Sequence, residues 1–287
     1  MSLLELYCHV DDFRQGFAGE WKCSLLASGQ RQRRRDRQLC VNKIMTIMIY
    51  FHQMCYRDFK TYYTQFVQVY LRSEFPRRVS YSRFVELMPS MLIPLCAYLQ
   101  RCYGDCTGIS FIDSTPIAIC HNRRIGRHRG FAELTQWGKN SVDWFFGFKL
   151  HLVVNDRGEL LACRLTGDHF DERALVLKLM QRLWGKLFGD KGYLSRPLTE
   201  QLRQRGITLI TKLKSNMKNR FILLSDRPLL RKCSILETIT DQLKNISQIE
   251  QFWHRSLANF MVNLVAGLIA YCHHPKKPSL ALDFRQP

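Results

Sequence analysis

The chain has 287 residues, of which 46% are hydrophobic, and its 43 Lys and Arg against 24 Asp and Glu give a formal net charge of +19. This length and composition allow one large domain or two smaller ones with a packed core, and they exclude a disordered chain. The positive charge predicts a polyanionic partner such as DNA or RNA, although it would also suit a ribosomal protein or an anionic membrane surface.

The cysteines and the apolar stretches limit where the protein works. The eleven cysteines include no CxxC pair, which favours a reducing compartment over a disulfide framework. Residues 1–12 carry three acids and no apolar core, so they do not read as a signal peptide. The most apolar stretch, residues 257–272, is shorter than the roughly 20 residues that cross a bilayer. We therefore expect a soluble protein without a membrane segment.

The first third of the chain predicts helices. Residues 1–38 end in the basic run RQRRRDR, which predicts an N-terminal arm that either contacts phosphates or is a solvated charge cluster. Apolar residues at helical spacing then predict helices over 39–56, about 57–74 and 81–103. Ser80 is expected to cap the third helix, and Gly104 to end it. Residues 39–104 are therefore predicted to form a small all-α domain, and their basic residues favour DNA binding of the helix-turn-helix type.

The remainder predicts a mixed α/β domain over residues 105–275 with a C-terminal helix, followed by a tail over 276–287. Strands are expected near 109–113, 145–154, 160–165, 186–190 and 207–211, and helices near 171–183, 198–205 and 235–246. Three strands followed by alternating helices and strands are typical of an RNase H-like sheet. Such a sheet is a three-strand antiparallel meander extended by parallel crossovers.

Three acids stand out in this order of elements. Asp113 and Asp190 each end a short apolar run, in ISFIDSTP and KLFGDKGY, and the two strands should be parallel, so both reach one sheet edge. Glu237 lies on a predicted helix and faces away from the apolar stripe that begins at Ile235. Carboxylate oxygens suit a pair of Mg²⁺ ions, which in phosphoryl transfer stabilise the attacking and the leaving oxygen.

Basic residues are expected beside these acids. The connection 114–144 begins and ends at the same sheet edge and contains HNRRIGRHRG. The residues predicted to contact the DNA backbone are Arg123, Arg124, Arg127, Arg129, Lys191, Lys212 and Lys214. A solvated loop is the alternative for the four arginines, and a zinc site at Cys102, Cys106, Cys120 and His121 is disfavoured because the spacings match no usual module.

Successive sequence blocks resemble the DDE transposases of the IS982 insertion-sequence family. These blocks are FIDSTP, FGFKLHLVVNDRGEL, GDKGY, LITKLKSNMK, ILETITDQLK and HRSLANFMVNLVAGLIAYC, and the N-terminal TIMIYFHQMCYRDFKTYY and FPRRVSYSRFVELMP are also similar. The resemblance covers almost the whole chain. It implies an RNase H-like catalytic domain that uses two Mg²⁺ ions, with Mn²⁺ as a substitute. It also implies binding to the double-stranded inverted repeats of a mobile element, DNA cleavage and strand transfer, and a cytoplasmic, nucleoid-associated protein of bacteria. A homodimer is expected because two ends must be held together.

The same resemblance assigns roles to single residues. Asp113, Asp190 and Glu237 match the catalytic, metal-binding triad, and Lys244 matches a lysine seven residues after the glutamate. Lys244 would hold a phosphate, with a surface ion pair to Asp241 as the alternative. Related families carry an arginine four residues before the glutamate, whereas this chain has Cys233, so a phosphate contact is expected to be lost.

Two other functions fit the same features. One is a nuclease of the RNase H superfamily that hydrolyses DNA without joining it. The other is a non-catalytic DNA-binding protein, either a repressor or a decayed transposase. An N-terminal helical domain suited to recognising element ends favours the transposase over the nuclease.

Overall fold

The computed structural model describes residues 1–27, 39–119, 136–139, 144–167, 172–212, 223–250 and 256–280. The chain divides into two compact units. The helical unit comprises Met1–Cys102, Asn245–Ile249 and Arg255–Pro275, and the sheet unit comprises Tyr103–Lys244, Glu250–His254 and Lys276–Pro287. Within the described ranges, every helix is too short or too polar to cross a membrane.

The described part of the helical unit contains helices and turns. Its elements are α1 (Leu3–Ala27), α2 (Val41–Gln53), α3 (Phe59–Thr61), the π-helical η1 (Tyr62–Val67), α4 (Tyr81–Leu87), the 3-10 turn η2 (Met88–Met91), α5 (Leu92–Arg101) and α10 (Leu257–Cys272). The predicted cap at Ser80 is confirmed, because its hydroxyl accepts the Arg83 N–H at 3.3 Å. Pro89 stands at the start of η2, which interrupts the third predicted helix.

Helix α1 occupies the first part of the region predicted as an N-terminal arm. Its residues Leu6, Val10 and Phe13 are buried, and the helix packs against α2. Three apolar side chains at helical spacing need a partner surface, so the first half of α1 is packed. The basic run at 31–37 lies outside the described residues.

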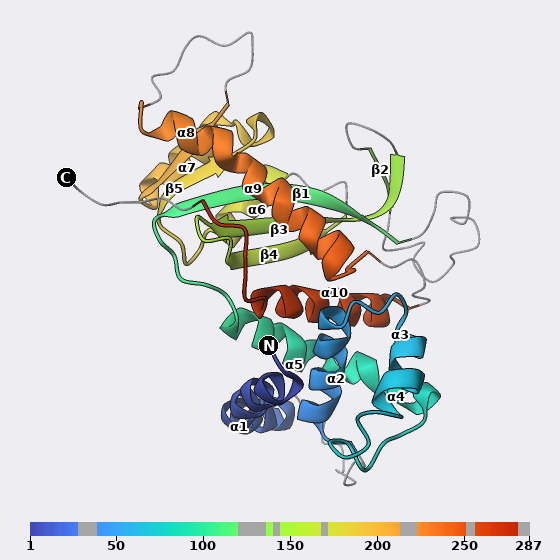
Figure 1. Cartoon of the computed structure of the whole chain (residues 1–287). Helices are drawn as coiled ribbons and strands as arrows, with labels where there is room; N and C mark the ends of the chain where they lie inside the picture. The colour runs from blue at the N-terminus through green and yellow to red at the C-terminus, as the bar shows by residue number, and fades with distance from the viewer. Residues whose placement is uncertain are drawn as a thin grey trace, which may run out of the picture. The chain divides into compact units, whose positions relative to one another are not determined.

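Helix α10 is apolar on all sides and packs against α2 and α5 (Figure 1). A helix without a polar face needs apolar neighbours around it, and the helical unit supplies them. Gly267 allows one close approach, because an added Cβ would lie 2.5 Å from the Cγ2 of Ile249. By its packing, α10 belongs to the helical unit.

The sheet unit contains six strands in its described part: β1 (Ile109–Ala118), β2 (Gln136–Lys139), β3 (Trp144–Asn155), β4 (Leu160–Thr166), β5 (Gly185–Gly189) and β6 (Ile207–Thr211). Antiparallel pairs join β1 to β3 and β3 to β4, and parallel pairs join β1 to β5 and β5 to β6. This is the predicted meander followed by parallel crossovers. Strand β2, which pairs antiparallel with β3, was not predicted.

The antiparallel pairing of β3 with β4, expected from the meander, is confirmed, and one side chain holds the turn between them. The Asn155 side-chain oxygen accepts the backbone N–H groups of Arg157 at 3.0 Å and Glu159 at 2.9 Å. Gly158 has a φ of +72°, and a Cβ there would lie 1.9 Å from the carbonyl oxygen of Pro278. Only glycine fits this position without strain.

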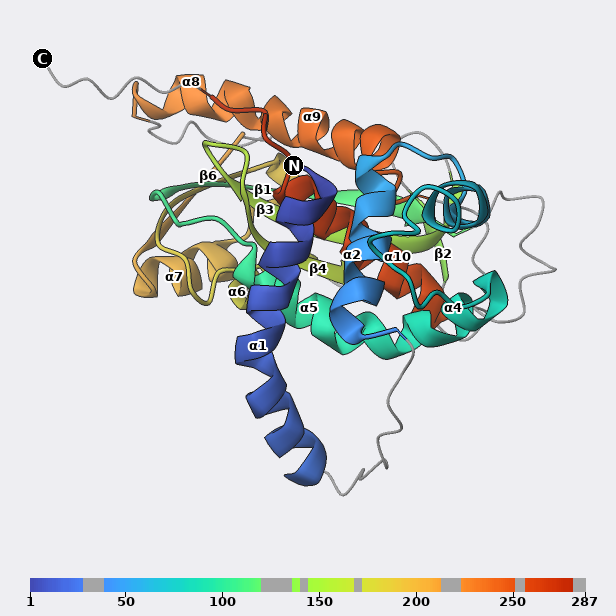
Figure 2. The same ribbon diagram turned by 60° about the horizontal axis from the view of Figure 1, so that its bottom comes forward.

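Helices cover both faces of the sheet. The sheet lies between α9 (Ile235–Asp241) on one face and α6 (Glu172–Leu179) and α7 (Arg196–Gln204) on the other (Figures 1 and 2). A short helix, α8 (Asp226–Arg231), precedes α9, from which it is separated by the 3-10 turn η6 (Lys232–Ser234). The π-helical η7 (Gln242–Ile246) follows α9. Each face of the sheet therefore packs against helices.

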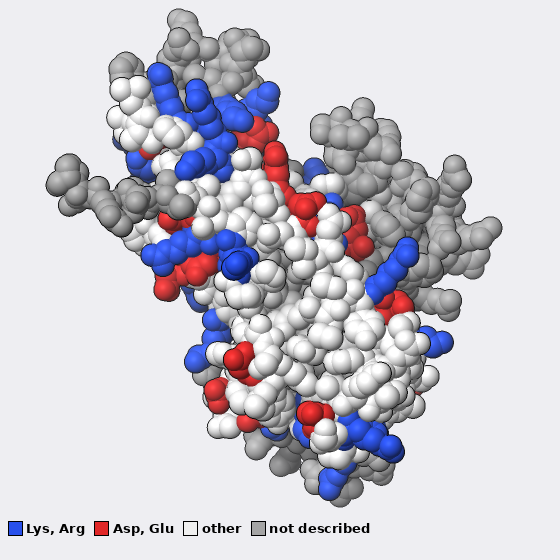
Figure 3. Space-filling view, in the orientation of Figure 1, with Lys and Arg blue, Asp and Glu red and all other residues white. Residues whose placement is uncertain are grey.

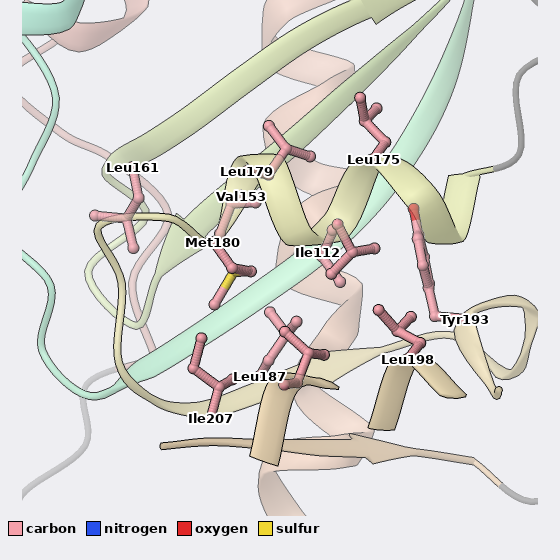
Figure 4. Packing of buried hydrophobic residues seen from close by; sticks show 12 residues of the cluster. Ile112, Val153, Leu161, Leu175, Leu179, Met180, Leu187, Tyr193, Leu198 and Ile207 are labelled. Atoms are coloured by element: carbon pink, nitrogen blue, oxygen red, sulfur yellow. The ribbon is translucent and has the colours of Figure 1, made fainter. Parts of the chain in front are cut away.

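The two faces are assigned by the alternation of side chains along the strands. Ile112 of β1 and Leu187 of β5 belong to the core beneath α6, together with Leu175 and Leu179 of that helix (Figure 4). Neighbours in sequence point to opposite faces of a strand. Phe111 and Phe188, whose rings stack at 5.3 Å, therefore lie on the α9 face.

Candidate active site

The two predicted aspartates lie side by side at the edge where β1 and β5 stop pairing. Ile112 is the partner of Gly189 in this parallel pair, so Asp113 and Asp190 are the next residues along adjacent strands. Neighbouring strands run about 4.8 Å apart. Each aspartate is two residues after a phenylalanine of the α9 face, and the extended backbone of Asp190 (φ −71°, ψ 163°) preserves that alternation. Both carboxylates therefore lie on the face covered by α9.

Strand β1 is longer than predicted. The strand predicted near 109–113 continues to Ala118 in register with β3. Pro116 lies beyond the last residue of β1 that pairs with β5. Its carbonyl faces this unpaired edge of β1 and accepts a hydrogen bond from Lys244 at 2.8 Å. The missing N–H therefore breaks no ladder bond. Asp113 lies within β1, half-buried, and its Oδ1 accepts the Ser114 N–H at 2.8 Å.

Glu237 lies on α9 with the orientation that the sequence predicts. Ile235, Leu236 and Ile239 are buried beneath the helix, whereas Glu237 is exposed, as is Asp190. Among the residues that the structure describes, no three His, Cys, Asp or Glu side chains gather closely enough to hold a metal ion. Asp113 and Asp190 are therefore adjacent, and Glu237 lies on the helix that covers them. The three carboxylates are not close enough together to bind one metal ion.

Cys233 links α9 to the two aspartates. Burial raises the pKa of its thiol to about 11; the positive charge of Lys212 counteracts this, and the negative charges of Asp113 and Asp190 add to it. These influences put the thiol within electrostatic reach of all three side chains. In the sequence, Cys233 stands out only because related families carry an arginine at this position. Its position one turn before Glu237 was the available signal that it faces the site.

Lys244 is held at the free edge of β1. Its ammonium donates to the Pro116 carbonyl and forms an ion pair with Glu250 at 3.2 Å. The second oxygen of Glu250 accepts the Ala118 N–H at 2.8 Å. The sequence suggested Asp241 as an ion-pair partner of Lys244, and the structure shows an ion pair with Glu250. Together, Lys244 and Glu250 join the end of the α9 region to β1.

Other predicted contact residues are only partly described. Lys191 and Lys212 are exposed, and both follow the carboxyl ends of strands, β5 and β6 respectively. Arg123, Arg124, Arg127, Arg129 and Lys214 lie outside the described residues. Figure 3 shows acidic side chains along α9 and a dense group of Lys and Arg over α8. On this face, the acids of α9 thus lie apart from the basic group over α8.

Comparison with known families matches this unit. Residues 103–257, more than half of the chain, match the family model described as a transposase DDE domain. The chain belongs to this family. Membership of the transposase DDE domain family makes it a transposase- or nuclease-type enzyme, and the match spans β1, β5 and α9, from which the three acids come.

Comparison with solved structures gives a distant similarity. A piggyBac transposase in a cryo-EM synaptic complex with hairpin DNA aligns with a TM-score of 0.46 and 12% sequence identity. The alignment covers 84% of this chain and 69% of the piggyBac chain. No curated protein matches the sequence.

Proposed function

We propose that this DDE-domain protein is a DNA transposase of the IS982 type, which binds the double-stranded inverted repeats of an insertion sequence and catalyses DNA cleavage and strand transfer. The observation that carries the proposal is the adjacency of Asp113 and Asp190 on parallel strands, on the face covered by the helix of Glu237. Two copies of the chain would hold the two ends of the element.

The donor set fits hard divalent cations. Asp113, Asp190 and Glu237 offer carboxylate oxygens, the ligands that Mg²⁺ and Mn²⁺ prefer. The nearby Cys233 offers a sulfur atom, a soft donor that suits these hard cations poorly. Two Mg²⁺ ions held by these carboxylates would supply an activated water or 3′-hydroxyl and a stabilised leaving oxygen.

Completing the site requires Glu237 to approach the two aspartates. Asp190 and Glu237 are both exposed, so their carboxylates can change rotamer without leaving a packed core. Three carboxylates close together repel one another until a cation neutralises them.

Positive side chains around the acids would hold the DNA backbone. Related families carry an arginine at the position of Cys233. Lys212 lies within electrostatic reach of Cys233 and would supply part of the positive charge of that arginine. Lys244 uses two of its three N–H donors on Pro116 and Glu250, which leaves one for a phosphate oxygen. Lys191, Lys214 and the arginines at 123, 124, 127 and 129 would extend this contact along the duplex.

The experiment is incubation of the purified protein with labelled element ends in Mg²⁺, Mn²⁺ or EDTA, with Glu237→Ala as the matched variant. Metal-dependent cleavage and joining that Glu237→Ala abolishes supports the transposase. Cleavage without joining identifies the nuclease. Binding without cleavage in every metal identifies a non-catalytic DNA-binding protein.

A further inference from the structure

A polar hollow in the helical unit lies apart from every residue assigned above. Its volume is about 450 Å³, and its lining residues are Gln68, Arg72, Pro76, Arg78, Val79 and Ser80. The lining includes two arginines and no acidic side chain. An open, positively charged concavity of this kind matches a small anion better than an apolar ligand.

Arg78 contributes a donor that has no acceptor. Its Nη1 is buried, and among the described residues it has no hydrogen-bond partner. Because this nitrogen is closed to solvent, a ligand in the hollow would reach Arg78 through its other guanidinium nitrogens. Guanidinium groups pair best with carboxylate or phosphate oxygens, to which they donate two parallel hydrogen bonds.

The wall of the hollow is fixed in place by its own hydrogen bonds. The Val79 carbonyl accepts the Tyr63 hydroxyl at 2.7 Å and the Gln68 side-chain N–H at 3.3 Å. The oxygen that would repel an anion is therefore already occupied by two donors. Tyr63 is buried and belongs to η1, and π-helical turns are frequent at functional sites.

Ser80 adds a further donor. Its hydroxyl oxygen accepts the Arg83 N–H, so its proton is oriented away from that bond and can be donated. The nearest acid along α4, Glu86, is paired with Arg83 at 2.7 Å, and both side chains are exposed. This pair lies outside the lining of the hollow.

We propose that the hollow binds one phosphate group of the DNA backbone, with Arg78 donating to its oxygens, Arg72 supplying the second charge and Ser80 a hydroxyl donor. The affinity for a phosphate follows from the pocket alone. That DNA supplies the phosphate rests on the proposed function. A free inorganic phosphate has the same chemistry, and the experiment separates the two sources.

The test measures binding of a labelled duplex end in EDTA by fluorescence anisotropy, at several salt concentrations, for the full chain. Arg78→Ala and Arg72→Ala are each expected to weaken binding by about tenfold and to reduce the slope of log affinity against log salt by about one. Arg78→Lys should restore part of the affinity, because it keeps the charge and loses the fork of donors. Arg83→Ala is the matched control, because that exposed arginine lies outside the hollow.

A second measurement follows thermal unfolding with and without inorganic phosphate. Loss of both duplex affinity and phosphate stabilisation in Arg72→Ala, an exposed position where folding is not at stake, supports the proposal. Loss of phosphate stabilisation with unchanged duplex affinity makes free phosphate the ligand and overturns the assignment to DNA. An unchanged response in both assays overturns the pocket. Because EDTA prevents cleavage, these outcomes do not depend on whether the chain is a transposase.

Discussion

The two units hold their charged groups in opposite ways. In the sheet unit, the carboxylates of Asp113 and Asp190 are adjacent at the ends of parallel strands, and the exposed Lys212 lies within electrostatic reach of Cys233 beside them. In the helical unit, Arg72 and Arg78 line a hollow whose lining contains no acid. Adjacent carboxylates favour binding of a cation, and a hollow lined by arginines favours binding of an anion. We therefore expect metal-dependent chemistry in the sheet unit and binding of the DNA backbone in the helical unit.

The largest expected effect is the loss of DNA cleavage when an aspartate of the sheet unit is replaced. Asp113→Asn removes a metal-ligand charge without changing the size of the side chain, and DNA cleavage should fall by roughly 10³-fold or more. Duplex affinity should stay within about threefold, because the arginines of the hollow are untouched. Gel assays of cleavage, paired with anisotropy in EDTA, check both values. A parallel loss of both activities would contradict the separation of the two roles.

Cys233 reports on the charge around the aspartates. With its pKa raised to about 11, the thiol has roughly 100-fold less thiolate at pH 8 than an ordinary cysteine, so iodoacetamide should modify it slowly. The rate should rise about tenfold per pH unit until the pH nears 11. Mass spectrometry of the alkylated peptides measures this, with the exposed Cys55 as the internal control.

Lys212→Ala sharpens that experiment. Lys212 lowers the pKa of Cys233, so its removal should slow alkylation further. Lys191→Ala, another exposed lysine of the sheet unit, is the matched control. Equal rates in the wild type and Lys212→Ala would show that Lys212 does not act on this site.

A third prediction concerns the stability of the sheet unit. Lys186 of β5 forms an ion pair of 2.6 Å with Asp226, which is only 3% exposed. Lys186→Met leaves that buried carboxylate without its partner and should lower the free energy of unfolding by roughly 2–3 kcal/mol. Urea unfolding measures the loss, and the double variant Lys186→Met with Asp226→Asn should recover most of it. A single variant as stable as the wild type would show that water solvates Asp226.

The smallest expected effect tests the tie between Lys244 and β1. Glu250→Gln keeps an acceptor for the Ala118 N–H but removes the negative charge beside Lys244. Duplex affinity at low salt should rise by about two- to threefold, because the lysine is released toward phosphate and the net charge increases by one. Lys244→Ala should lower the affinity by a similar factor. If Glu250→Gln weakens binding, Glu250 positions Lys244 and does not compete with phosphate.

Features that depend on neighbouring residues were predictable from the sequence. Alternating side chains predicted β3, the Asn155–Gly158 turn predicted its hairpin with β4, and Ser80 predicted the start of α4. The positions of Asp113 and Asp190 followed from strand order, because parallel neighbours end at one edge. The roles of these residues and the independence of residues 39–104 as a domain stay predictions.

The sequence by itself determined the local periodicities, caps and turns, because those depend on contacts within a few residues. Only the tertiary structure decided the packing of α1 and α10, the passage of β1 through Pro116, the position of Cys233 beside two aspartates and the pairing of Lys244 with Glu250. It also decided that Arg72 and Arg78 line one hollow. Each of these features depends on a residue far along the chain or on the shape of the folded surface. The spacing of residues in the sequence predicts neither the distant contacts nor the surface shape.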